Sequence, residues 1–276
     1  MTTASPQRTL WLAAGSLLAV VLILWAGFSL AGWTVGSVER NEHHVLRGHV
    51  SEVRVDGTSG DVTLVPAGGR EVVVDSHAKG TLWLPEMQTR IAGDHVMVRG
   101  SCHIVVFGSC SASFVVRVPD GTPVRVRTSS GDVRVNGLDG RVDVKVSSGD
   151  VQLAGLGGGT SAKVSSGDIN ARRLGGRVDL ETSSGDVNAA DLTARIVNAR
   201  ATSGDVFVDV AAVPQRVNAA SSSGDVTILV PRGADAFDGQ VATSSGDRRL
   251  GVRSDPNATR SLTAITSAGD AAIRYR

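Results

Sequence analysis

The chain has 276 residues, of which 33 are glycine, and aromatic residues make up only 4% of it, so a core of bulky rings is not expected. The 28 basic and 27 acidic residues give a net charge of +1. No overall electrostatic field would gather phosphates, and we predict no nucleic-acid partner.

A long apolar segment lies near the N-terminus. Residues 10–35 contain no charged side chain, and a helix needs about 20 residues to cross a membrane. We therefore expect a cytoplasmic tail at 1–9, one transmembrane helix at 10–35 and a linker at 36–50. The C-terminal part would then be extracytoplasmic, on a single-pass protein of the cell membrane. The alternative is a cleaved signal peptide ending near Ala31, although its apolar region is typically about 7–15 residues long.

Residues 51–121 are rich in short β-type stretches separated by glycine and polar breaks. Val53 and Val62 flank Asp61 at the offsets of the repeat described below, so one coil should begin near Ser51. The remainder reads as an N-terminal β-sheet that caps a repeat region, because an open sheet edge invites aggregation.

The two cysteines of the chain, Cys102 and Cys110, lie in this region. The seven residues between them resemble a strand followed by a Gly-Ser turn, which suits a local hairpin disulfide. Such a bridge is plausible in an exported domain. Two buried free thiols are the alternative.

A repeated Ser-Gly-Asp motif dominates the rest of the chain. From the second copy the spacings run 18, 18, 18, 19, 20, 22 and 23 residues, and the last copy is a degenerate Ser-Ala-Gly-Asp. The motifs end at Asp61, Asp132, Asp150, Asp168, Asp186, Asp205, Asp225, Asp247 and Asp270.

Apolar residues occupy fixed columns one, three and six positions after each Asp and six positions before it, and Arg248 is the first exception in the first column. Apolar and polar residues alternate on both sides of the turn, which indicates strands. We predict an all-β fold, with a parallel β-solenoid of about 18-residue coils over 122–276. An antiparallel meander is the alternative, but Val above Val and Leu above Leu favour parallel stacking. The polar pair Arg248-Arg249 and the drifting spacing suggest that the last coils form a second cap.

The apolar N-terminal segment, Val118-Pro119-Asp120-Gly121 and the reiterated Ser-Gly-Asp-Val together resemble the bacterial family named "putative adhesin", whose β-strand-repeat domain has no established function. The likeness extends from about Ser51 to the C-terminus. The resemblance implies a β-helix-like fold and raises surface adhesion as a function. It implies no catalytic residues.

The Asp column is the first candidate for a site. Neighbouring carboxylates about 4.8 Å apart need solvation, hydrogen bonds or a cation. Calcium takes six to eight oxygen ligands, more than one Asp per coil supplies with its turn. We therefore predict turn hydrogen bonding, with no metal and no cofactor. The membrane-proximal His43, His44 and His49 are the other possible metal site, but we favour a solvated linker for them and predict no metal there.

We predict no catalytic site. All six histidines precede the regular repeat, so the coils contain no Ser-His-Asp arrangement. A polysaccharide-cleaving β-helix enzyme is the enzymatic alternative, but no irregular polar insertion interrupts the coils.

Two non-enzymatic functions remain. The first is a surface adhesin or scaffold whose outward side chains bind a glycan, an envelope polymer or a protein. Its contact face would include Arg134, Asn136, Asp143, Lys145, Gln152 and Asn170. The second is an envelope-stress or signalling accessory that binds a membrane partner.

Overall fold

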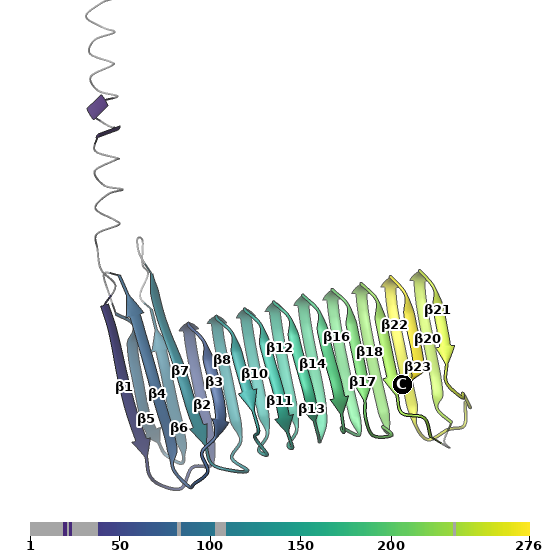
Figure 1. The fold of residues 1–276 in the computed structure, drawn as a ribbon, viewed down its shortest axis with the longest axis horizontal. Coiled ribbons are helices and arrows are strands. Elements are labelled where there is room, and N and C mark those ends of the chain that lie inside the picture. The colour runs from purple at the N-terminus through teal and green to yellow at the C-terminus, as the bar shows by residue number, and fades with distance from the viewer. Residues whose placement is uncertain (1–18, 21, 24–37, 82–83, 103–108, 234–235) are drawn as a thin grey trace, which may run out of the picture.

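The computed structural model describes residues 19–20, 22–23, 38–81, 84–102, 109–233 and 236–276 (Figure 1). The expected tail at 1–9 and nearly all of the expected transmembrane helix at 10–35 lie outside these residues. Within the described ranges, no helix has the length and apolar character needed to cross a membrane.

Two long sheets form the rod that Figure 1 shows. In spatial order, the 12 strands of sheet A are β1 (Val38–Leu46), β4 (Val72–Gly80), β7 (Cys110–Val118), β3 (Val62–Pro66), β9 (Val133–Asn136), β11 (Val151–Leu156), β13 (Ile169–Leu174), β15 (Val187–Leu192), β17 (Val206–Val210), β19 (Val226–Val230), β23 (Ala271–Tyr275) and β21 (Arg248–Gly251). The 11 strands of sheet B are β20 (Asp238–Ser245), β22 (Ser261–Ala268), β18 (Arg216–Ser223), β16 (Ile196–Ser203), β14 (Arg177–Ser184), β12 (Thr160–Ser166), β10 (Val142–Ser148), β8 (Val124–Ser130), β2 (Glu52–Ser59), β6 (His95–Ser101) and β5 (Glu86–Ala92).

Each coil consists of one strand of sheet B, a Ser-Gly-Asp turn and one strand of sheet A. Successive coils pair in parallel without a change of register through the regular repeats, so that Val151 lies between Val133 and Ile169. The predicted parallel stacking is confirmed, and the antiparallel meander is wrong for the repeat region.

The core lies between the two sheets and consists of the predicted columns. Members of all four, such as Val133, Val135, Leu156 and Val144, are at most 1% exposed. Valine, leucine and alanine fill this narrow space, and burying one Val or Leu side chain contributes about 1.5–3 kcal/mol. Since every coil repeats the same few contacts, the rod can extend without a larger core.

The N-terminal end combines two parallel coils with antiparallel strands. The β2–β3 coil stacks on β8 and β9, as expected from Ser51 onward, and β6–β7 stacks on its other side. In sheet A, β4 pairs antiparallel with β7 and β1 pairs antiparallel with β4, and in sheet B β5 pairs antiparallel with β6.

The segment 36–50, expected to be a linker, contains strand β1. Its sequence, VERNEHHVL, lacks the apolar alternation of a core strand, because β1 lies at the sheet edge and its side chains are mostly exposed. Polar contacts hold it to β4: Lys79 Nζ lies 3.1 Å from Glu39 Oε1 and His43 Nδ1 lies 2.5 Å from Asp75 Oδ1. Charged edge strands of this kind discourage pairing with other chains.

At the C-terminal end the order of coils in space differs from their order in the sequence. The last coil, β22–β23, inserts between β18–β19 and β20–β21, so the coil of Asp247 is outermost (Figure 1). Ala271 and Ile273 of β23 are buried, whereas all of β21 is exposed. The β22–β23 coil is apolar enough to be covered by a neighbouring coil on each side. The β20–β21 coil carries Arg248 and Arg249 and therefore suits the end of the rod, where one side stays in contact with water.

Arg276, which follows β23, holds the β22–β23 coil in its position between the other coils. The Arg276 amide donates to the Val230 carbonyl at 2.9 Å, and its guanidinium donates to Asp191 at 2.8 Å. Its Nε also lies 2.9 Å from Asp209 Oδ1. Burial raises the pKa of Asp209, and Arg276 opposes that rise. One side chain thereby ties the C-terminus to two earlier coils.

Removal of one whole repeat should leave the fold intact. Deleting residues 151–168 joins Asp150 to Ile169 and lets β10 pair with β14 in the same register. We expect an unchanged β-type circular dichroism spectrum and a melting temperature within about 5 °C of the parent, because each coil contacts only its neighbours.

The matched control deletes only 151–159. This variant lacks one sheet A strand and cannot continue the coil, so it should lose its cooperative melting transition. Equal melting of the two deletions would contradict the repeat boundaries.

Candidate functional site

The Ser-Gly-Asp turns form a continuous hydrogen-bonded ladder along one edge of the rod. In eight of the nine turns, all but that of Asp247, the Asp Oδ1 accepts a hydrogen bond from the backbone N–H of the Asp in the next coil. The N···O distances are 2.7–3.1 Å. In space the order is Asp61, Asp132, Asp150, Asp168, Asp186, Asp205, Asp225, Asp270 and Asp247.

This turn ladder has a different residue at its start. The Asp61 N–H donates to Ser113 Oγ at 3.1 Å, so a serine of β7 occupies the place of the carboxylate in the first coil. At the other end, Asp247 belongs to the outermost coil of the described chain. The nine predicted turn residues therefore form one structural series, with Asp270 and Asp247 exchanged relative to sequence order.

The glycine before each Asp brings neighbouring turns into direct backbone contact. Gly167 has φ +135°, which L side chains rarely adopt, and a Cβ there would lie 2.2 Å from the Gly149 carbonyl oxygen. The same close approach recurs at Gly185 and Gly204. Glycine is required here because no side chain fits between the coils.

A column of buried hydroxyl groups supports several turns from inside, and we did not predict it. Thr182 Oγ1 donates to the Gly167 carbonyl at 3.0 Å, and Ser221 Oγ donates to the Gly204 carbonyl at 2.8 Å. In the coils of Asp150 and Asp168, Val146 and Val164 occupy the same position. The recurrence of Thr or Ser four residues before the Asp, at positions 128, 182, 221, 243 and 266, was the available signal.

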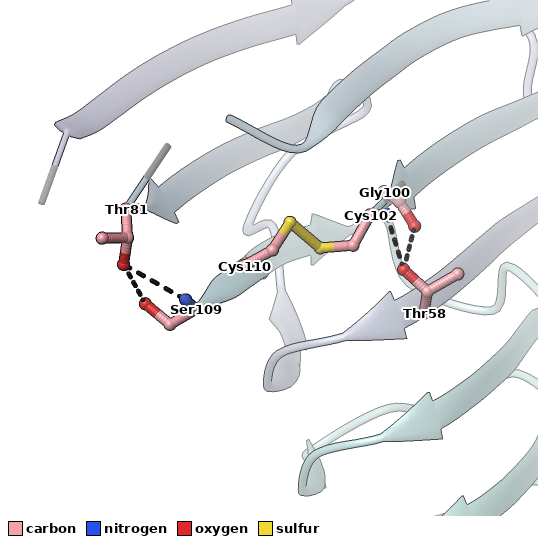
Figure 2. The surroundings of a disulfide bond; sticks show 6 residues. All are labelled: Thr58, Thr81, Gly100, Cys102, Ser109 and Cys110. Atoms are coloured by element: carbon pink, nitrogen blue, oxygen red, sulfur yellow. Dashed lines mark hydrogen bonds between the residues drawn. A yellow bond between two sulfur atoms is a disulfide. The ribbon is translucent and has the colours of Figure 1, made fainter. Parts of the chain in front are cut away.

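The cysteines form a disulfide that differs from the expected hairpin bridge. Cys102 and Cys110 are bonded, with their Cα atoms 6.0 Å apart. However, β6 and β7 lie in different sheets, so the disulfide links the sheets where later coils have a Ser-Gly-Asp turn (Figure 2). Thr58 Oγ1 accepts from the Cys102 N–H at 3.0 Å, beside this bond. The expected strand and turn between the cysteines fall mainly on residues 103–108, outside the described residues.

The histidines all belong to the N-terminal end, and the structure does not bring His43, His44 and His49 into one site. His43 contacts Asp75, which Arg117 Nη1 also approaches to 2.5 Å, whereas His44 contacts Glu42. The hydrogen bond from His43, followed by that from Arg117, holds the pKa of Asp75 below its usual value. The described residues include no group of three or more His, Cys, Asp or Glu placed to hold a metal ion.

The outward residues expected to form one polar face lie on two. Arg134, Gln152 and Asn170 are neighbours in one row of sheet A. Asn136 lies in the same sheet but outside this row. Asp143 and Lys145 lie on β10, in sheet B. The strand before each turn belongs to sheet B and the strand after it belongs to sheet A. An outward polar residue therefore lies on sheet B if it precedes the Asp in the sequence, and on sheet A if it follows.

Replacing Gly167 by Ala should destabilise the protein, whereas replacing Gly69 should not. An alanine at 167 meets both the unfavourable φ and the Gly149 carbonyl, and we expect a loss of more than about 2 kcal/mol. A Cβ at Gly69 meets nothing within 4 Å. Thermal unfolding of the two variants measures the difference, and equal melting temperatures would show that the turn contact is dispensable.

Calcium should not change the melting temperature. One oxygen already accepts a backbone hydrogen bond in eight of the nine Asp residues, and we expect identical unfolding of the full-length protein in calcium and in chelator. An Asp168→Asn variant retains an acceptor oxygen for the Asp186 N–H and should melt close to the parent. A large calcium-dependent rise that this variant reduces would identify the turn ladder as a cation site instead.

Several solved structures are similar to this chain. Among solved structures, a Bacteroides fragilis protein named "putative adhesin" aligns with 15% identity over 87% of this chain and 97% of its own, with a TM-score of 0.48. A "putative adhesin" of Parabacteroides merdae aligns with 9% identity, 88% and 97% coverage and a TM-score of 0.33. A "putative cell adhesion protein" of Clostridium sporogenes aligns with 9% identity over 87% of this chain and 100% of its own, with a TM-score of 0.26.

No curated protein matches the sequence. The family model Toastrack DUF4097 matches residues 120–176 and 173–275, which together cover more than half of the chain and contain eight of the nine repeat turns. With this match, and with the stacked Ser-Gly-Asp coils that it covers, the chain belongs to the Toastrack DUF4097 family.

Proposed function

We propose that this chain is a non-enzymatic rod of the bacterial cell surface, anchored in the membrane by residues 10–35, which acts as an adhesin or scaffold through its outward polar side chains. The observation that carries the proposal is the unchanged register of successive coils from β9 to β15. This register turns single outward residues into straight rows, such as Arg134, Gln152 and Asn170. A long patterned surface suits binding to an extended partner.

The same regularity argues against an enzyme. From Val124 to Val230, a range that the structure describes throughout, at most five residues separate consecutive strands. Catalytic groups are usually carried by longer loops on a rigid scaffold. Residues 122–276 also contain no histidine, the commonest general base.

Deletion of the gene in its native bacterium tests this proposal. We expect attachment of the cells to surfaces or to one another to fall several-fold, and expression of the full-length chain to restore it. Complementation with the 151–168 deletion, which should keep the fold but shorten the rod and remove Gln152 and Lys163, asks whether this coil contributes to attachment. Unchanged attachment together with an altered envelope-stress response would instead favour the accessory role.

A further inference from the structure

Three basic side chains lie next to one another on the outer face of sheet B. Strand pairing places Arg127 beside Lys145 and Lys145 beside Lys163, about 4.8 Å apart in successive coils. All three are exposed. We call Arg127, Lys145 and Lys163 the cation row.

The cation row is unfavourable for the isolated rod. Like charges on directly neighbouring strand positions repel each other. Lys163 is partly neutralised, since its Nζ lies 2.6 Å from Glu181 Oε2. Arg127 and Lys145 have no ion-pair partner among the residues that the structure describes. Two neighbouring free cations on a chain of almost zero net charge indicate an anionic ligand.

A groove runs beside the cation row and follows the rod axis. It has a volume of about 600 Å³ and reaches from Asp56 to Glu181, across five neighbouring coils. The long basic side chains line it together with a second row of short, exposed hydroxyl residues. These are Ser129, Ser147, Ser165 and Ser183, which we call the serine row.

The two rows together define the ligand. Anionic groups of a bound ligand would accept hydrogen bonds from the guanidinium and ammonium groups of the cation row. Hydroxyl groups of the same ligand would form hydrogen bonds with the serine row. The coil spacing is comparable with that of successive sugars in an extended polysaccharide. Building on the proposed function, we propose that this groove binds a linear acidic polysaccharide whose carboxylates face the cation row.

Other polyanions fit less well. Single-stranded nucleic acid is usually bound by aromatic side chains that stack on bases, and no aromatic residue lines the groove. An anionic membrane surface requires a larger basic cluster than three residues. The acidic residues Asp56 and Glu181 close both ends of the cation row, which favours a short stretch of a moderately charged polymer over a densely charged one.

Binding of one groove should be weak, because its ion pairs remain exposed to water. A polymer offers many overlapping sites, and several rods on one cell can engage the same chain. Effective affinity then rises through multivalency without further contacts. This mode suits reversible attachment to an extracellular polymer.

The test uses the full-length protein in detergent micelles, with chelator present so that calcium cannot bridge carboxylates. Titration calorimetry compares tetragalacturonate with the neutral tetrasaccharide maltotetraose. We expect the acidic tetramer to bind, the neutral one to bind at least about tenfold more weakly, and added salt to weaken acidic binding.

Variants locate the binding. Arg127→Gln with Lys145→Gln should weaken tetragalacturonate binding about tenfold, since each lost exposed ion pair contributes a few-fold. The matched control, Arg172→Gln with Arg248→Gln, removes the same charge from exposed positions on sheet A and should bind like the parent. Glu181→Gln removes a carboxylate from the groove and frees Lys163, so it should bind more tightly, a gain that misfolding cannot produce.

Several results would overturn the inference. Equal weakening by the control variant would mean that binding depends on overall charge alone. Tighter binding of inorganic polyphosphate than of tetragalacturonate would reject the carboxylate assignment. If tetragalacturonate fails to bind although gene deletion abolishes attachment, the groove assignment is wrong while the adhesive function stands.

Discussion

The direct contact between the backbones of successive turns is the constraint on which this structure depends. A glycine such as Gly167 lies so close to the Gly149 carbonyl that no side chain fits between the two turns. The neighbouring Asp168 carboxylate accepts the Asp186 N–H and fixes the same alignment from outside. Because the register is set at the turn, the apolar columns on both sides align without long side chains to lock them together.

This constraint explains how much of the fold can be read from the sequence. A turn motif with fixed apolar offsets predicts which side chains point inward, and the buried Val133 and Leu156 follow that prediction. The pattern does not state which coil lies next to which. Coil order at the C-terminal end is decided by comparing whole coils, since only the one without Arg248 can be covered on both sides. A local pattern cannot make that comparison.

The candidate sites divide in the same way. The motif alone predicts the Asp series, and the spacing of the two cysteines predicts that they are bonded. That the disulfide links two sheets, and that Ser113 accepts the hydrogen bond of Asp61, can be seen only in the three-dimensional structure. Strand β1 was missed for a related reason. Its polar residues are compatible with a strand because it is an edge that buries little, whereas sequence patterns identify strands mainly by what they bury.

The position of the last coil has a consequence for biosynthesis. Strands β22 and β23 are synthesised last but occupy an internal place, and β20 and β21 pair with the rest of the rod only through them. During translation the chain must pass this place and leave it vacant until residue 276 has emerged. Folding from the N-terminus toward the C-terminus can therefore proceed coil by coil only as far as β19. The two outermost strands therefore gain their pairing partners only after β22 and β23 have been synthesised.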